Sequence, residues 1–231
     1  TGFFLYSRSN SKRLKNKSFK KIGNLMMVEH VISRLKKITN DENIFLLTTT
    51  NKADNSYIDI SKKNNIKIFR GSANNVLMRT AKCIKKNNID LVVRVCGDRP
   101  FFDIFELDKY VKYFEKNYSK FDFLSSEFKR KAISGLVIEI IKSKAIVKIN
   151  KRKISKDYKE HFTKFLYDNY QKFKIKKINS KFKSLNIKLS IDNEEDLEMS
   201  RYIVNKISKE DFYKTEKIIN LYKKWFNDNK Q

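Results

Sequence analysis

The sequence predicts an α/β protein of one domain, built on a mostly parallel central sheet. Through the first half of the chain, short apolar runs suited to strands buried on both faces alternate with amphipathic stretches suited to helices. The expected strands are residues 3–6, 44–48, 66–69 and 91–96, and the expected helices are residues 26–37, 55–64 and 74–86. Such units join parallel strands by right-handed crossovers and bind ligands outside the carboxyl ends of the strands.

The second half of the chain is less regular. A helix is expected near residues 105–116, strands near 121–124, 136–141 and 187–191, and two further helices near 194–206 and 212–227. Residues from about 125 to 182 interrupt the alternation, so this region is expected to be a small insertion lobe on the sheet. The 231 residues, 40% of them hydrophobic, are enough to bury a substantial core in a single domain, residues 1–231.

The charge of the chain is strongly positive. There are 52 Lys and Arg against 26 Asp and Glu, a formal net charge of +26, and fields of this sign attract nucleic acid and anionic lipid. The lysines are nevertheless spread along the whole chain, with only five Gly and one Pro, which indicates a compositional bias rather than one basic patch. A nucleic-acid-binding module would carry its cations on one face with interleaved aromatics. Such a basic protein is kept as an alternative, and nucleic acid is not the expected partner.

The two cysteines and the apolar segments predict the compartment. Cys83 and Cys96 lie in apolar contexts and are expected to be buried thiols in a reducing environment. No stretch approaches the roughly 18 apolar residues of a membrane span, and residues 1–9 lack the regions of a signal peptide. A cytoplasmic protein without a membrane partner is therefore expected. Because the chain begins at Thr1 and not at Met, its true amino terminus stays open.

Two carboxylates stand at the expected ends of strands. Gly97 and Pro100 in "VCGDRP" predict a tight turn that presents Asp98 at the carboxyl edge of the sheet. Asp192 in "LSIDNEEDLE" follows the last expected strand. Mg²⁺ commonly takes one or two protein carboxylates together with phosphate oxygens, so the pair is a candidate metal site. The alternative is that Asp98 fixes the turn and Asp192 caps the following helix.

A basic loop between the first strand and the first helix could bind phosphates. Hydroxyls and cations of the kind that bind a triphosphate recur in it, at Ser7, Arg8, Ser9, Ser11, Arg13 and Lys17. The loop has neither the pattern G-x-x-x-x-G-K-[ST] nor G-x-G-x-x-G, so it predicts neither a P-loop kinase nor a dinucleotide dehydrogenase. The alternative is a solvated basic loop.

Seven motifs, in order, resemble those of one family. They are "YSRSNSKRLKNKSFKKI", "VEHVISRLKK", "FRGSANNVLMR", "LVVRVCGDRPFFD", "SGLVIEI", "KEHFTKFLYDN" and "LSIDNEEDLE". Together they are similar to the SpsF-like cytidylyltransferases of spore-coat polysaccharide synthesis, relatives of the CMP-sialic acid and CMP-KDO synthetases. The resemblance spans about residues 3–205. It implies a nucleotide-diphosphosugar-transferase-like three-layer α/β sandwich, a CTP substrate and Mg²⁺.

The resemblance also implies roles for individual residues. Arg8, Arg13 and Lys17 would hold the triphosphate, and Asp98 and Asp192 would be the metal ligands. Further nucleotide-binding positions would be Ser7, Ser11, Gly71, Ser72, Arg79, Arg94 and Gly97. The acceptor side would include Gly135, Glu139, Glu160 and His161. For His161, a hydrogen-bonded packing role is favoured over a catalytic one, and His30 is expected on the first helix, facing the sheet.

Several positions depart from the family pattern. The Pro-Gly pair of the basic loop is here Lys15 and Asn16, which predicts a less constrained loop, and an Ala of the same loop is Ser7. Asn75 replaces an acid. Ser134 and Val137 replace two acids on the acceptor side, so the nucleotide half of the site is better supported than the acceptor half.

The implied reaction is transfer of CMP from CTP to an acidic sugar or related acceptor. An acceptor oxygen would attack the α-phosphorus in line and pyrophosphate would leave, with positioning and charge neutralisation as the main sources of catalysis. An acceptor that is a phosphonate or an alcohol phosphate stays an alternative. A homodimer formed through the insertion lobe is expected from the resemblance.

Overall fold

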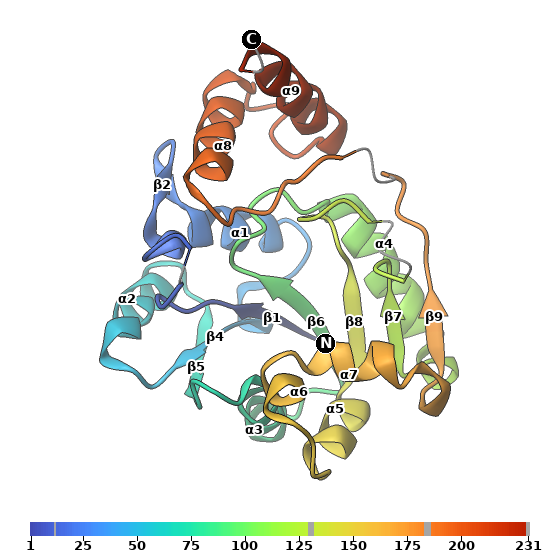
Figure 1. Cartoon of the computed structure of the whole chain (residues 1–231). Helices are drawn as coiled ribbons and strands as arrows, with labels where there is room; N and C mark the ends of the chain where they lie inside the picture. Colours follow the sequence, from blue (N-terminus) through green and yellow to red (C-terminus); the bar gives the residue numbers. More distant parts are fainter. Residues whose placement is uncertain (12, 129–131, 183–185, 230–231) are drawn as a thin grey trace.

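The computed structural model describes residues 1–11, 13–128, 132–182 and 186–229 (Figure 1). In this part of the chain, seven strands form one sheet in the order β5-β4-β1-β6-β8-β7-β9. The strands are β1 (Gly2–Tyr6), β4 (Ile44–Thr49), β5 (Lys67–Gly71), β6 (Leu91–Cys96), β7 (Phe123–Ser125), β8 (Glu139–Lys142) and β9 (Ile175–Lys177). A separate hairpin is formed by β2 (Lys21–Ile22) and β3 (Leu25–Met26).

The strand pairings are mostly parallel. β1 lies parallel to β4 and β6, β4 lies parallel to β5, and β7 lies parallel to β9. Within the seven-stranded sheet of the described residues, only β8 runs antiparallel to its neighbours, β6 and β7. The α/β fold with a mostly parallel central sheet is therefore confirmed.

Helices cover both faces of the sheet (Figure 1). One face packs against α1 (Met27–Leu35), α2 (Ser56–Lys63) and α4 (Ile104–Lys116), and the other packs against α3 (Val76–Asn87), α5 (Ser143–Asn150) and α7 (Phe162–Asp168). In β1, Phe3 and Leu5 enter the first core and Phe4 enters the second. A central strand buried on both sides explains why its sequence is continuously apolar. The arrangement is a three-layer sandwich.

The remaining helices are α6 (Lys156–Glu160), α8 (Glu194–Lys206) and α9 (Thr215–Asp228). α8 and α9 pack on each other at the carboxyl-terminal end of the molecule, where they share a third apolar cluster with Phe101, Leu136 and Leu189 (Figure 1). Across the described residues, no helix combines the length and apolar character needed to cross a membrane. Cys83 is buried and Cys96 is partly buried, and both are free thiols.

The prediction of a strand at residues 187–191 is wrong. This segment has one isolated bridge, between Ser134 and Lys188, and is not a strand of the sheet. Its alternating apolar residues Ile187, Leu189 and Ile191 are buried in the clusters beneath α8 and α9. An extended segment that buries alternate side chains produces the same period of two as a sheet strand, so the pattern cannot distinguish them.

The region 125–182 contributes its strands to the central sheet. β8 lies between β6 and β7, and β9 extends the same edge. Residues 129–131 of this region lie outside the described residues. The division into one domain with an insertion or dimerisation lobe stays a prediction.

The prediction that His30 faces the central sheet is wrong. It is buried on α1, where its Nε2 lies 2.7 Å from the carbonyl oxygen of Ile22 in the hairpin and its ring lies 5.7 Å from that of Phe212. Burial, reinforced by the charge of Arg34, lowers the pKa of His30 below 6.5, although the Ile22 hydrogen bond and Glu29 oppose the shift. His30 therefore fastens the hairpin to α1 as a neutral ring.

Stability should consequently fall as the pH drops below about 6.5. A base whose pKa is lowered by folding binds its proton more readily in the unfolded chain, so its contribution is complete above the unfolded pKa and is lost below it. Thermal unfolding at pH 7.5 and 5.5 should show a smaller difference in Tm for His30→Gln than for the unchanged protein. His161→Gln, at the exposed second histidine, is the control and should keep the original difference.

Candidate active site

The turn after β6 brings Asp98 against the basic loop that follows β1. The Gly97 amide donates to the carbonyl oxygen of Tyr6 at 2.9 Å. A Cβ on Gly97 would lie 2.7 Å from Ser7 Oγ, so only glycine allows the two loops to approach so closely. Gly97 therefore shapes the site through its lack of a side chain.

Asp192 reaches the same place from the carboxyl-terminal region. The amide of Ile191, its neighbour, donates to the carbonyl oxygen of Asp98 at 2.9 Å. The cap of α8 is Asn193, whose Oδ1 accepts from the Asp196 amide at 2.9 Å, with Asp196 accepting from Asn193 in return. The alternative role of Asp192 as the helix cap is therefore wrong, and its carboxylate is directed to other partners.

Lys17 joins the two carboxylates. Its Nζ lies 2.7 Å from Asp98 Oδ2, 3.4 Å from Asp192 Oδ1 and 3.0 Å from the carbonyl oxygen of Ile191. The Lys17 side chain is only 14% exposed. Burial alone would raise the pKa of Asp192, but Lys17, Lys188 and Arg13 hold it below its ordinary value. Asp192 is therefore held in its ionised form, and both carboxylates lie beside cations.

The two arginines of the loop also form ion pairs with carboxylates. Arg13 Nη2 lies 2.8 Å from Asp192 Oδ1, and the Arg13 side chain is 71% exposed. Arg8 Nη2 lies 2.8 Å from Glu160 Oε1 at the end of α6, and Arg8 Nη1 lies 3.4 Å from the carbonyl oxygen of Ala73. All three cations predicted to hold the triphosphate are thus paired with acids here.

The hydroxyls of the loop have different surroundings. Ser7 Oγ is buried, 2.7 Å from Ser18 Oγ and 2.8 Å from Tyr57 Oη. Ser11 is half-buried, and its amide donates to the carbonyl oxygen of Ser9 at 2.8 Å. Ser7 therefore fixes the start of the loop from inside the protein, whereas Ser11 is partly accessible.

Asn16 has a left-handed backbone conformation, which glycine adopts without strain. Its φ of 56° and ψ of 29° are left-handed, a conformation that Asn adopts more readily than other residues with a side chain. The 3₁₀ turn Lys17–Phe19 follows directly, so the Asn16 conformation sets the direction of Lys17. Of the two residues that stand in place of the Pro-Gly pair, Asn16 thus has a side chain that tolerates the conformation it adopts.

The loop after β5 surrounds a buried arginine. A Cβ on Gly71 would lie 2.9 Å from Arg79 Cγ, so glycine makes room for this side chain. Arg79 Nη1 donates to the carbonyl oxygen of Ser72 at 3.1 Å, and Arg79 Nε has no hydrogen-bond partner among the described residues. Burial, together with the charge of Arg8, lowers the pKa of Arg79. Asn75, which replaces an acid of the family pattern, caps α3: its Oδ1 accepts from the Met78 amide at 2.8 Å.

The residues expected on the acceptor side have different surroundings. Gly135 has φ +102°, and a Cβ there would lie 2.6 Å from the backbone of Leu189, so this glycine serves packing. Glu139 is buried in an ion pair with Arg94 and accepts from Tyr167 Oη at 2.8 Å. Burial alone would raise the pKa of Glu139, but Arg94 and Arg99 lower it. The Arg94 guanidinium also lies 5.9 Å from the Phe162 ring of α7, so this pair is covered.

Glu160 and His161 lie on another element. Glu160 meets Arg8 of the basic loop, as described above. His161, between α6 and α7, is exposed, so the packed histidine favoured from the sequence is not what the structure contains. Ser134 Oγ lies 2.7 Å from Ser190 Oγ, and Val137 is half-buried, so the two positions that lack the family's acids face different surroundings.

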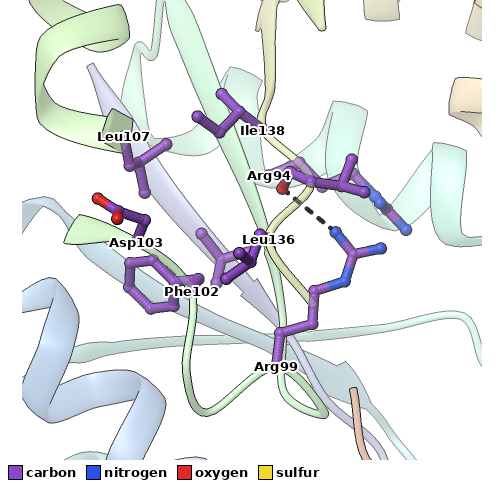
Figure 2. Close-up of a pocket in the computed structure, with 9 residues that line it drawn as sticks. Arg94, Arg99, Phe102, Asp103, Leu107, Leu136 and Ile138 are labelled. Carbon is purple, nitrogen blue, oxygen red and sulfur yellow. Dashed lines mark hydrogen bonds between the residues drawn. The ribbon is translucent and has the colours of Figure 1, made fainter. Parts of the chain in front are cut away.

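A small cavity of about 10 Å³ lies between β6, α4 and residues 136–138 (Figure 2). Arg99 enters from the turn and donates through Nη1 to the carbonyl oxygen of Val137 at 3.4 Å, as the dashed line in Figure 2 shows. A space of this size holds about one water molecule and no nucleotide. Arg99 therefore braces the turn that carries Asp98.

Two contributors to the site were missed from the sequence. The carbonyl oxygen of Ile191 binds Lys17, and no residue pattern reveals a backbone contact of this kind. Asp54 is buried and accepts hydrogen bonds from Ser9 of the basic loop. A usable signal existed for Asp54, because it is an acid shortly after an expected strand, as Asp98 is.

The donor set suits a hard divalent cation that also binds phosphate. Within the described residues, no group of three or more His, Cys, Asp and Glu side chains is arranged to hold a metal ion by itself. Asp98 and Asp192 are the two carboxylates that converge, and the Lys17 ammonium stands between them as a cation. Mg²⁺ is commonly held by one or two carboxylates with water and substrate phosphates, so the residues present fit it.

The fold and the family of the chain are shown by comparison with known proteins. The topology is that of nucleotide-diphosphosugar-transferase-like proteins: a cytidylyltransferase from Leptospira borgpetersenii matches with a TM-score of 0.91 and 29% identity, over 98% of this chain and 94% of that one. CMP-2-keto-3-deoxy-manno-octonic acid synthetase, solved with CTP, matches with a TM-score of 0.69 and 12% identity, over 88% of this chain and 98% of that one. The second likeness shows the fold alone.

The chain belongs to the cytidylyltransferase family, whose model matches residues 3–228. A relative from Methanocaldococcus jannaschii, an uncharacterized protein, is 34% identical over 84% of this chain and 79% of its own length. The spore coat polysaccharide biosynthesis protein SpsF of Bacillus subtilis is 22% identical over 88% of this chain and 86% of its own length. The resemblance to SpsF-like cytidylyltransferases related to CMP-KDO synthetase is thereby confirmed.

The left-handed conformation of Asn16 can be tested by substitution. Asn16→Ala should lower the free energy of unfolding by about 1 kcal/mol, since a side chain that cannot mimic glycine is strained there. Asn16→Gly should leave it unchanged or slightly higher. Urea denaturation of the two variants gives the comparison, and equal destabilisation by Ala and Gly would contradict the role assigned to the backbone.

Proposed function

We propose that this nucleotidyltransferase transfers CMP from CTP to an acidic sugar or a related acceptor, with Mg²⁺ as cofactor and release of pyrophosphate. Membership of the cytidylyltransferase family supports CTP as the nucleotide. The observation that carries the proposal is the convergence of Asp98 and Asp192 on Lys17, with Arg13 beside them. Acids for a divalent ion and cations for phosphate thus lie at one edge of the sheet.

The residues of the chain have separable tasks in this reaction. Asp98 and Asp192 would hold the metal, which when bound draws charge from the phosphate that is attacked. Lys17, Arg13 and Arg8 would bind the triphosphate and stabilise the departing pyrophosphate through charge-assisted hydrogen bonds. An acceptor oxygen attacks the α-phosphorus while the bond to pyrophosphate breaks. No side chain has to act as a nucleophile, because the nucleotide is positioned and not covalently held.

Binding of the nucleotide exchanges counterions. Without ligand, Lys17 and Arg13 are neutralised by Asp98 and Asp192, and Arg8 is neutralised by Glu160. Phosphate oxygens would take over the cations, and the divalent ion would take over the two aspartates. The two aspartates and the three cations would each keep a partner, which avoids the cost of an unpaired charge in a partly buried site. Glu160, released by Arg8, has a side chain that is 37% exposed and can be solvated.

Two classes of acceptor are candidates. The B. subtilis relative is a spore coat polysaccharide biosynthesis protein, which supports a sugar acceptor for polysaccharide synthesis. Ser134 and Val137, in place of acids, favour keeping a phosphonate or an alcohol phosphate as the second candidate. A cytoplasmic location and a homodimer complete the proposal and rest on the sequence.

Activity is tested by pyrophosphate release. Incubation with each of the four NTPs, Mg²⁺ and a panel of acidic sugars, phosphonates and alcohol phosphates should give release with CTP and one acceptor class. Asp98→Asn should lower kcat by at least about 100-fold while far-UV circular dichroism stays unchanged, because one of the two metal ligands loses its charge. Undiminished turnover in that variant would remove Asp98 from the metal site.

If a divalent ion displaces the Lys17 ammonium from the two aspartates, removal of Lys17 should strengthen metal binding and weaken CTP binding. Lys17→Met should bind Mn²⁺ alone about tenfold more tightly, because the competing ammonium is gone, and should bind CTP more weakly. Electron paramagnetic resonance of free Mn²⁺ and calorimetry with CTP measure the two affinities. Lys15→Met changes the same charge at an exposed position of the loop and is the control. Equal Mn²⁺ affinity in both variants would show that Lys17 does not compete for the metal position.

A further inference from the structure

Asp54 is a buried carboxylate that has no task in the proposed reaction. It stands at the end of a 3₁₀ turn, Lys52–Asp54, that follows β4, and its side chain is 2% exposed. Its Oδ1 accepts from the amide of Ser9 at 2.8 Å and from Ser9 Oγ at 2.6 Å. Its Oδ2 accepts from the amide of Thr49 at 3.3 Å and from Thr49 Oγ1. Both oxygens are therefore saturated by neutral donors.

Burial of a carboxylate costs free energy unless every hydrogen-bond donor stays in place. Burial alone would raise the pKa of Asp54, but the hydrogen bonds from Ser9 and Thr49 hold it below its ordinary value. The hydrogen bonds offset the free-energy cost of burying this carboxylate, so the loss of any one donor weakens the whole arrangement. Ser9 is thus tied to β4 by a strong, charge-assisted contact.

This contact acts on the basic loop at the residue next to Arg8. Ser7 is anchored on the other side by Ser18 and Tyr57, at 2.7 and 2.8 Å. Arg8 is therefore the residue between two buried anchors, and its own side chain is 43% exposed. With both neighbouring residues fixed, the backbone of Arg8 is held in place, and its side chain extends to Glu160.

The turn that carries Asp54 is itself braced. Arg70 of β5 donates from Nε to the carbonyl oxygen of Thr49 at 2.9 Å and from Nη2 to the carbonyl oxygen of Asn51 at 3.0 Å. The same Nη2 lies 2.9 Å from Asn55 Oδ1, and the Asp54 amide donates to the carbonyl oxygen of Asn51 at 3.0 Å. Asp54 is accordingly a rigid point to which the loop can be fastened.

We propose that Asp54 is a positioning residue, which orders residues 7–11 so that Arg8 is presented to the phosphates of the nucleotide. Asp54 itself touches no ligand, since both of its oxygens are occupied inside the protein. The consequence for the nucleotide rests on the proposed function, whereas the ordering of the loop does not. Asp54→Asn places an amide donor against Ser9 or Thr49 and leaves at least one donor without an acceptor.

The experiment measures loop order and nucleotide binding separately. Hydrogen exchange without ligand should show faster exchange of the amides of residues 7–11 in Asp54→Asn, with β6 unchanged. Calorimetry with CTP and Mg²⁺ should show an affinity about 10–100-fold lower, the usual range for a supporting partner of a binding residue. Asp59→Asn removes the same charge from an exposed position of α2 and should alter neither measurement.

A double-mutant cycle distinguishes positioning of Arg8 from a general loss of structure. If Asp54 acts through Arg8, then adding Asp54→Asn to Arg8→Met should cost little further CTP affinity. Ser9→Ala removes one donor and leaves the carboxylate and the Thr49 bonds in place. It should give the same changes to a smaller extent, and it serves as the test if Asp54→Asn fails to fold.

The outcomes separate the two proposals. If the unchanged protein does not bind CTP with Mg²⁺, the proposed function is wrong, while hydrogen exchange still decides whether Asp54 orders the loop. If the unchanged protein binds and Asp54→Asn binds equally well, the positioning role is wrong. It is also wrong if the loss of affinity caused by Asp54→Asn is just as large in the Arg8→Met background.

Discussion

The pairing of Lys17 with Asp98 and Asp192 is the interaction on which the rest of the site depends. Two carboxylates that share a partly buried position repel each other, and they stay ionised together only beside cations. Here Lys17 lies within 3.4 Å of both, with Arg13 and Lys188 beside Asp192. The carboxylates therefore have cations beside them without any ligand, and the divalent ion proposed above would take the place of those cations.

Three segments that are remote in the sequence have to meet before this pairing can form. Gly97 lets the turn after β6 approach Ser7, and the Ile191 amide fastens the last segment to Asp98. The basic loop is held by apolar contacts as well, because Leu14 is buried in a cluster with Ile191, Leu197 and Ile22 of the hairpin. A loop rich in exposed cations thus keeps its shape through the few side chains that point inward.

The sequence is sufficient to predict the parts of the fold that follow from local pattern. Strands buried on both faces, such as β1 and β6, are continuously apolar and fall close to their expected ranges. Asp98 and Asp192 were expected to meet because each follows a strand, yet Asp192 follows an extended segment held by Ser134 and Asp98. Contacts such as that of Lys17 with Ile191 depend on tertiary packing, and no periodicity encodes them.

Asn16 exemplifies how this chain manages with five glycines. In the described part of the chain, the non-glycine residues with positive φ are all asparagine: Asn16, Asn65, Asn88 and Asn186. In this chain, poor in glycine and rich in asparagine, asparagine occupies the left-handed positions, where its stereochemistry comes nearest to that of glycine. Mutational drift of the gene could thus change composition extensively and leave the path of the backbone intact.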